Sequence, residues 1–403
     1  MASDDTRFRQ EEQLRLKLHR LQAIQIIDTP LTHDKIKNVK FITVLLCRVS
    51  GNGVIMLFKI VDKSEFHALL IMLLASHEVI APRIVATGRD GKPLHNYLPV
   101  TSPEEIDLGF ETTLNSAKTY FLPYNENLST WDFSESDWIQ NISYRMHPRV
   151  IIGLHACDIN ALLKLDKVIA REFYPSPYYI SRRKNSFIIG IDHIPCRGAF
   201  CRSLGTDTVN RGFDLFLTDL GNRYFVAIDS DRGYSTLQRV TVRDVTEEDT
   251  EAYLEVRRKI AAGFDPDLPV RQLPNLMDIE FNADVWDKWG SRCLSCGSCA
   301  MVCPTCYCYG VTETVAMDFT TGTKVRQLYS CNLADFATVA GGHNFRPTRE
   351  SRLKYRYYHQ HRGFVETYDE PKCVGCGRCS RTCLAGINPP DIFRDLLAKE
   401  EQS

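Results

Sequence analysis

The sequence contains neither a stretch suited to crossing a membrane nor a charge excess that would attract nucleic acid. Its 403 residues carry a formal net charge of −1 at pH 7. The most apolar helical stretch, residues 66–75, is far shorter than the roughly 20 residues that span a bilayer. Residues 1–20 are dense in charge and cannot be a secretory signal peptide. We therefore expect a cytoplasmic protein whose partners include neither a nucleic acid nor a membrane.

Sequence motifs of common catalytic sites are also absent. The chain has no Gly-x-Gly-x-x-Gly and no Walker A pattern, so no dinucleotide or nucleotide site is indicated. It has no Gly-x-Ser-x-Gly and no His-Glu-x-x-His pattern, which are typical of serine hydrolases and zinc proteases. The sequence therefore indicates no substrate site, and whether the chain is itself an enzyme stays open.

Cysteine, in contrast, is abundant and ordered. Eight of the 15 cysteines form two copies of the spacing C-x2-C-x2-C-x3-C, offset by 80 residues. In two-cluster ferredoxins each [4Fe–4S] cluster takes three thiolates from one such run and the fourth from the other. This rule predicts Cys293, Cys296, Cys299 and Cys383 as the ligands of cluster 1, and Cys373, Cys376, Cys379 and Cys303 as the ligands of cluster 2.

Two other interpretations of the cysteine runs are weaker. Zinc sites usually contain two C-x2-C pairs separated by a gap, whereas these runs are triplets followed by a fourth cysteine. A disulfide framework is typical of a small secreted chain, whereas this chain has 403 residues and we expect no secretory leader. The spacing therefore favours two [4Fe–4S] clusters, and a pair of neighbouring clusters indicates electron transfer.

Composition and hydrophobic pattern divide the chain into four segments and predict a multidomain α+β fold. Residues 1–140 form an α+β region, and residues 141–262 alternate strands with helices as in an α/β region. Residues 263–274 contain three prolines and are predicted to be a linker. Residues 275–403 contain both cysteine runs and are predicted to form an α-helical dicluster ferredoxin domain. Strands are expected at residues 149–153, 187–191, 213–217 and 224–228, and helices at residues 64–78, 246–262 and 390–399.

Three further cysteines follow predicted strands of the α/β region. Cys157 comes directly after one apolar strand, and Cys196 and Cys201 come after the next. Ligands bind at the carboxyl ends of strands in open α/β sheets, and neighbouring strand ends lie close together. We therefore expect a third iron–sulfur cluster at these cysteines. Its fourth ligand stays open between Asp158, His155 and a cysteine of the helical domain.

The remaining cysteines give weaker signals. Cys306, Cys308 and Cys331 form a second group of three cysteines, near the first run, that could be considered in place of Cys157, Cys196 and Cys201. We expect them to pack against cluster 1. Cys47 lies in a predicted strand and is expected to be a small buried hydrophobic residue.

A basic stretch interleaved with tyrosines covers residues 346–362. Such a stretch is compatible with nucleic-acid binding. We favour another interpretation, because nearby cations offset the negative charge of an iron–sulfur cluster and raise its potential. The same charges could also dock an acidic partner.

The cysteine runs, together with PTCYCY at 304–309 and GGHNFR at 341–346, resemble a known family. This family contains the β subunit of cytoplasmic sulfhydrogenase and its relative in anaerobic sulfite reductase. Two positions depart from its pattern. Leu384 stands where a proline usually follows the last cysteine, and Ala199 stands where relatives often have another cysteine.

The resemblance implies an electron-transfer subunit of a multi-subunit oxidoreductase. Members of the family carry electrons between a flavoprotein subunit, which binds FAD and NAD(P)H, and a catalytic metalloenzyme subunit. That metalloenzyme is of the hydrogenase, sulfite reductase or heterodisulfide-reductase type. The alternative is a catalytic subunit whose open-site iron–sulfur cluster is held by Cys157, Cys196 and Cys201. A purely structural scaffold is a third interpretation.

Overall fold

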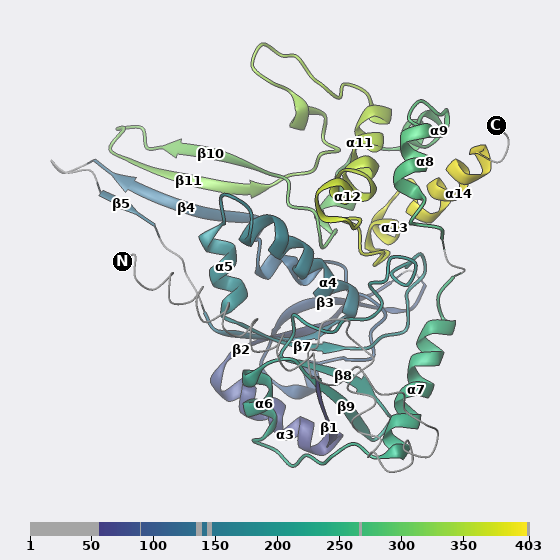
Figure 1. Cartoon of the computed structure of the whole chain (residues 1–403). Coiled ribbons are helices and arrows are strands. Elements are labelled where there is room, and N and C mark those ends of the chain that lie inside the picture. The colour runs from purple at the N-terminus through teal and green to yellow at the C-terminus, as the bar shows by residue number, and fades with distance from the viewer. Residues whose placement is uncertain (1–55, 89, 134–138, 143–146, 266–267, 401–403) are drawn as a thin grey trace, which may run out of the picture. The chain divides into compact units, whose positions relative to one another are not determined.

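The computed structural model describes residues 56–88, 90–133, 139–142, 147–265 and 268–400 (Figure 1). Within these residues seven strands form a mixed sheet in the order β1-β9-β8-β7-β6-β2-β3. The four strands β2, β6, β7 and β8 are parallel, and the outer strands are antiparallel to their neighbours. The strand bounds are Leu57–Asp62 (β1), Glu78–Thr87 (β2), Pro93–Val100 (β3), Arg149–Leu154 (β6), Ser186–Ile191 (β7), Leu215–Asp219 (β8) and Arg223–Ile228 (β9).

Helices cover both faces of this sheet, which is why its central strands are continuous apolar runs. α3 (Lys63–Ser76) and α6 (Asp231–Leu237) contribute to the core on one face. α4 (Ala156–Leu165) and α5 (Pro177–Lys184) contribute to the core on the other. Figure 1 shows these two helix pairs on opposite sides of the strands. The carboxyl ends of β6 and β7 lead into the cysteine-bearing segments.

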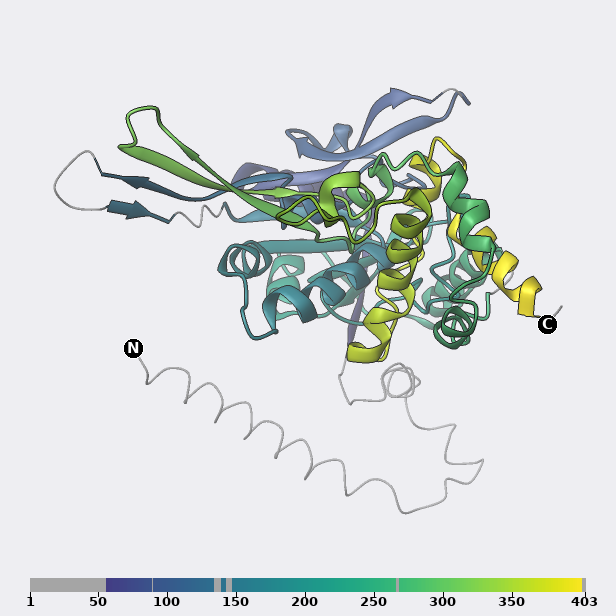
Figure 2. The ribbon, with the colours of Figure 1, turned by 90° about the horizontal axis from the view of Figure 1, so that it is seen from above.

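A second, four-stranded sheet joins segments that are far apart in the sequence. Its antiparallel order is β10-β11-β4-β5, with bounds Tyr309–Val315 (β10), Thr321–Leu328 (β11), Asn125–Asp132 (β4) and Ile139–Asn141 (β5). Figure 2 shows this sheet projecting to one side of the helices. The buried carboxylate of Glu126 on β4 forms an ion pair with Arg326 on β11. The hairpin between the two cysteine runs is thus bound to the N-terminal half of the chain.

Helices dominate the C-terminal part of the described chain. α7 (Glu247–Ala262) precedes this part of the chain. The helices of the C-terminal part are α8 (Leu273–Ile279), α9 (Val285–Arg292), α10 (Ser298–Met301), α11 (Arg349–His361), α12 (Gly363–Tyr368), α13 (Arg378–Thr382) and α14 (Pro389–Glu400). Trp286 and Trp289 of α9 pack with Leu353 of α11 and with Phe393 and Leu396 of α14. This apolar core lies directly beside the cysteine runs.

The predicted fold class, a mixed α/β region followed by a dicluster region, is confirmed. Each strand and helix expected between residues 64 and 399 is present within a few residues of its predicted position. Strands from both sides of residue 140 share the seven-stranded sheet, and the hairpin β10–β11 adds strands to a region expected to be helical. Cys47 lies outside the described residues. None of the described helices is both long and apolar enough to cross a bilayer.

Candidate metal centres

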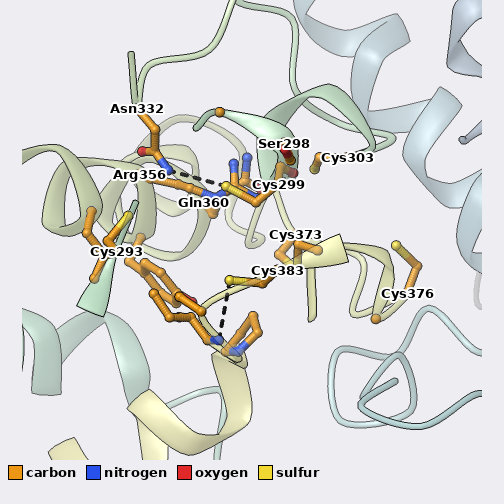
Figure 3. Close-up of a pocket in the computed structure, with 18 of the residues that line it drawn as sticks. Cys293, Ser298, Cys299, Cys303, Asn332, Arg356, Gln360, Cys373, Cys376 and Cys383 are labelled. Carbon is orange, nitrogen blue, oxygen red and sulfur yellow. Dashed lines mark hydrogen bonds between the residues drawn. The ribbon is translucent and has the colours of Figure 1, made fainter. Parts of the chain in front are cut away.

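All eight cysteines of the paired runs line one cavity. Figure 3 labels Cys293, Cys299, Cys303, Cys373, Cys376 and Cys383 among the residues of its wall. The space that the eight cysteines surround, with its open mouth, measures about 910 Å³. Every cysteine of the described residues is a free thiol, so no disulfide removes a sulfur from this set. The other walls are largely apolar and include Leu353, Tyr357 and Ile387. The cavity therefore suits a bulky cofactor that is bound through thiolates.

Each run bends at a glycine with positive φ. Gly297 has a φ of 77° and Gly377 a φ of 73°, a conformation that side chains with a Cβ rarely adopt. These glycines precede the short helices α10 and α13, which contact each other. A Cβ on Gly297 would also come within 2.8 Å of the Cβ of Ser330. The tight bends let three cysteines of a run face the same space.

Backbone N–H groups donate to the first sulfur of each run at equivalent positions. Ser295 N donates to Cys293 Sγ at 3.4 Å, and Gly375 N donates to Cys373 Sγ at 3.3 Å. Hydrogen bonds to a charged acceptor are stronger than those between neutral groups, so these donors would stabilise negative charge on a cluster-bound sulfur. The loops thus offer what an anionic iron–sulfur cluster requires: converging sulfurs and N–H donors.

The fourth cysteine of each run lies near sulfurs of the other run. Burial raises the pKa of the Cys299 thiol, and thiolates including those of Cys303 and Cys383 raise it further. Burial also raises the pKa of Cys373 to about 12 and that of Cys379 to about 11, and in both cases the Cys303 thiolate adds to the effect. Cys383 therefore approaches the first run, and Cys303 approaches the second.

A buried guanidinium lies beside these sulfurs. Arg356 on α11 donates to the Cys299 carbonyl oxygen at 3.1 Å and to Cys306 Sγ at 3.3 Å. Burial disfavours its charge, but the thiolates of Cys299 and Cys306 hold the pKa of Arg356 well above its usual value. Asn332 Nδ2 donates to Cys299 Sγ at 3.2 Å. Positive charge and hydrogen bonds at the sulfurs both stabilise a more reduced cluster.

The basic side chains of α11 are divided between two faces. Arg352 and Arg356, one turn apart, are buried, and Arg352 Nη2 donates to Ser295 Oγ at 3.1 Å. Lys354 instead lies over the exposed ring of Phe281, with its Nζ 3.2 Å from the ring centroid. The buried face of the basic stretch thus contributes charge to the cysteine cavity.

A second cysteine group lies at the carboxyl ends of β6 and β7. The Sγ atoms of Cys157 and Cys201 and a ring nitrogen of His193 all lie within 4.8 Å of one another. Cys196 belongs to the same buried cluster, and its Sγ lies 3.6 Å from the carbonyl oxygen of Cys376. The structure thus brings together the three cysteines singled out in the sequence and adds His193 as a further donor.

Aromatic stacking orients the imidazole of this group. The ring of His193 lies parallel to that of His155 with a centroid separation of 3.7 Å, and His155 stacks on Phe110 at 4.2 Å. Burial lowers the pKa of His193 to about 4, so its ring is neutral at pH 7. Asp158, one of the fourth ligands considered from the sequence, instead accepts hydrogen bonds from Arg378. His155 is buried between the rings of Phe110 and His193, and its Nε2 has no hydrogen-bond partner among the described residues.

The remaining trio lies beside Cys303 and forms close thiol contacts. Cys306 Sγ accepts hydrogen bonds from Arg356 and from Gln360, each at 3.3 Å. A hydrogen bond with Cys331 lowers the pKa of Cys308 to about 6, and the same contact raises the pKa of Cys331. That these three cysteines serve packing stays a prediction.

Comparison with known proteins identifies the family. Residues 292–387 match the model of a 4Fe–4S dicluster domain. Over 325 residues the chain is 36% identical to sulfhydrogenase 2 subunit beta of Pyrococcus furiosus, which covers 78% of this chain and 94% of that relative. The chain belongs to the sulfhydrogenase subunit beta family. No solved structure matches it.

Family membership confirms the resemblance noted in the cysteine runs and in the stretches between them. The dicluster match establishes two [4Fe–4S] clusters, and the cavity, the free thiols and the N–H donors fit two such groups. The chain is thus an iron–sulfur protein of the electron-transfer type, related to the sulfhydrogenase β subunit. The group of Cys157, His193 and Cys201 lies outside the matched span and has ligand atoms for another metal.

Proposed function

We propose that the chain relays electrons between a flavoprotein subunit, which binds FAD and NAD(P)H, and a catalytic metalloenzyme subunit of the hydrogenase type. The observation that carries this proposal is the single cavity lined by all eight cysteines of the two runs. Two clusters in one cavity are close enough to exchange electrons, and the sequence shows no substrate motif beside them. The similarity to a sulfhydrogenase subunit favours the hydrogenase type over the sulfite reductase and heterodisulfide-reductase types.

The proposed ligands follow the crossed pattern of two-cluster ferredoxins. Cluster 1 takes Cys293, Cys296, Cys299 and Cys383, and cluster 2 takes Cys373, Cys376, Cys379 and Cys303. The effect of the Cys383 thiolate on Cys299, and that of Cys303 on Cys373 and Cys379, support this assignment. Cys303 also acts on Cys299 of its own run, so it lies between the two sets of sulfurs.

The mouth of the cavity suits electron exchange with a partner. Cys296 is exposed, and its neighbour Leu294 is 55% exposed. Leu384, next to Cys383, is 87% exposed and also lines the cavity. An apolar rim around a cluster gives a partner a surface on which to exclude water, and a short distance to the cluster. We therefore assign cluster 1 to the contact with a partner and cluster 2 to the interior of the relay.

The test is a reconstitution of the complex. The full chain, purified without oxygen from its own host, should bring with it a flavoprotein and a metalloenzyme that contains nickel and iron. NAD(P)H should then reduce the two clusters only while the flavoprotein is bound. Electron paramagnetic resonance measures this reduction. Reduction of the isolated chain by NAD(P)H, or its isolation as a stable monomer, would contradict the proposal. Recovery with a sirohaem protein would favour the sulfite reductase type.

A matched pair of surface variants tests the proposed contact. Leu384→Glu places a charge on the rim of the cavity and should slow electron transfer from the partner by about tenfold or more, because a buried unpaired charge at an interface costs at least about 1.4 kcal/mol. Met317→Glu changes another exposed apolar residue, located between β10 and β11, and should leave the rate unchanged. Both variants should retain the spectra of two clusters. Equal rates in the two variants would move the docking surface elsewhere.

A further inference from the structure

We propose that Cys157, His193, Cys196 and Cys201 bind one tetrahedral divalent metal ion, with Zn²⁺ as the expected occupant, instead of a third iron–sulfur cluster. Cys157 lies in the first turn of α4, directly after β6, and the other three come from the loop after β7. Their spacing, His-x2-Cys-x4-Cys plus one distant cysteine, gives the Cys3His set of structural zinc sites.

The separation of the donor atoms favours a single ion. Cys157 Sγ, Cys201 Sγ and a ring nitrogen of His193 all lie within 4.8 Å of one another, the one such group among the described residues. Around one tetrahedral zinc ion, with metal–sulfur distances near 2.3 Å, two sulfurs lie about 3.8 Å apart. A [4Fe–4S] cube holds its thiolates farther apart, because each binds a different corner. Among the described residues, no three of the eight sulfurs of the paired runs converge to within 4.8 Å of one another in this way.

Ring stacking fixes the plane of the His193 imidazole. His193 stacks on His155 with an interplanar angle of 1°, and Phe110 stacks on the other side of His155. Such surrounding contacts fix the ring plane and hence the direction of the donor nitrogen. Burial of Cys157 and Cys201 as small apolar side chains would explain the two thiols. It would not explain why an imidazole nitrogen converges on them.

We assign Cys196, the remaining cysteine of the loop after β7, as the fourth donor; its Sγ donates to the carbonyl oxygen of Cys376 at 3.6 Å and would turn from there to the ion. Cys196 lies three residues after His193 and packs in the same buried cluster as Cys157 and Cys201. Asp158 is engaged by Arg378, so its carboxylate does not compete for the ion. With four protein ligands the coordination sphere is closed, which makes a structural centre and leaves no open position for catalysis.

The loop that carries three of these ligands is packed against the loop of cluster 2. Phe200 N donates to the Gly375 carbonyl oxygen at 2.8 Å, and Thr206 Oγ1 donates to that of Val374 at 2.7 Å. A Cβ on Gly375 would come within 2.5 Å of Cys201 N, so the two loops touch closely. An ion at this group would therefore fix the sheet to the loop that bears Cys373 and Cys376.

Metal analysis of the intact, anaerobically purified chain tests the proposal. We expect about eight irons and about one zinc per chain. Zinc-edge X-ray absorption should show a mixed sulfur and nitrogen shell, with Zn–S distances near 2.3 Å. About twelve irons per chain would assign a third cluster and overturn the proposal, as would eight irons without any further metal.

Variants locate the ion. Cys157→Ala and His193→Ala should each lose most of the zinc and keep the iron of both clusters. His193→Cys should keep the zinc but change its shell to sulfur only, which a merely folded loop would not produce. Cys331→Ala removes a buried thiol outside the group and should leave the zinc unchanged. Zinc loss in Cys331→Ala equal to that in Cys157→Ala, or an unchanged shell in His193→Cys, would overturn the proposal.

Discussion

Arg378 donates to both carboxylate oxygens of Asp158, at 2.7 and 2.8 Å, and both side chains are almost fully buried. Arg378 begins α13, between two cysteines of the second run, and Asp158 lies in the first turn of α4. The guanidinium also donates to Thr113, and Tyr97 donates to Asp158. A bidentate, buried ion pair therefore holds the second cysteine run against the seven-stranded sheet.

Loss of one partner of this pair should destabilise the chain strongly. Arg378→Met leaves the Asp158 carboxylate buried and unpaired, which costs about 3–5 kcal/mol. Chemical denaturation without oxygen measures this change. Arg394→Met removes an exposed pair with Asp391 and should cost about 1 kcal/mol or less. The double variant Asp158→Leu/Arg378→Met should recover part of the loss, and equal losses in both single arginine variants would contradict the role of burial.

Crossed ligation predicts a specific non-additivity in iron content. The double variant Cys293→Ala/Cys296→Ala should lose cluster 1 and retain about four irons per chain. Adding Cys383→Ala should change nothing further, because that cysteine belongs to the cluster already lost. Adding Cys303→Ala should damage cluster 2 and lower the iron content again. The opposite order of effects would show that each run binds its own cluster.

The hydrogen bond from Asn332 to Cys299 Sγ should tune the potential of one cluster. Its removal in Asn332→Leu should make cluster 1 harder to reduce, because donors to sulfur stabilise the reduced state. The reduction potential of cluster 1 should fall by several tens of millivolts. For one electron, about 59 mV corresponds to a tenfold change in the equilibrium constant of reduction. Redox titration followed by electron paramagnetic resonance measures this potential. Asn344→Leu, whose amide donates to the Ala334 carbonyl oxygen, serves as the control and should leave both potentials unchanged.

The parts of this site that could be predicted from the sequence are those whose residues follow a recognisable local pattern. Contacts between residues far apart in the sequence could not be predicted. Cys157 and Cys201 meet because each follows a parallel strand, and strand order could be inferred from apolar runs. His193 carried no such signal: only its place three residues before Cys196 could have indicated a ligand. The partnership of Asp158 with Arg378 was not predictable, since 220 positions separate them and no local pattern records the contact.

Acid should weaken the fold through a buried histidine on α11. Burial, together with the charges of Arg356 and Lys164, lowers the pKa of His361 to about 3. Its unfolded value is about 6.5, so between these values the unfolded chain binds the extra proton and stability falls as the pH falls. The expected loss between pH 7.5 and 5.5 is about 1.4 kcal/mol in total, and the slope approaches about 1.4 kcal/mol per pH unit only well below pH 6.5. Denaturation midpoints between pH 7.5 and 5.5 measure the slope.

The neutral replacement is the control for this pH dependence. His361→Gln cannot take up the proton and should show a flatter profile, even if its stability at pH 7.5 is lower. His77→Gln changes an exposed histidine and should retain the full slope. Parallel profiles for the wild-type chain and His361→Gln would assign the acid sensitivity to other groups.

The pairing of β4 with β11 has a consequence for how the chain is made. Glu126 on β4 and Arg326 on β11 are 200 positions apart. At roughly 5–20 residues per second, β4 leaves the ribosome about 10–40 s before its partner strand exists. During that interval β4 presents an open strand edge, which invites pairing with another chain. Newly made chains thus pass through an aggregation-prone stage before the second cysteine run has been synthesised. With crossed ligation neither cluster can be completed during that stage, because each needs at least one cysteine of the second run.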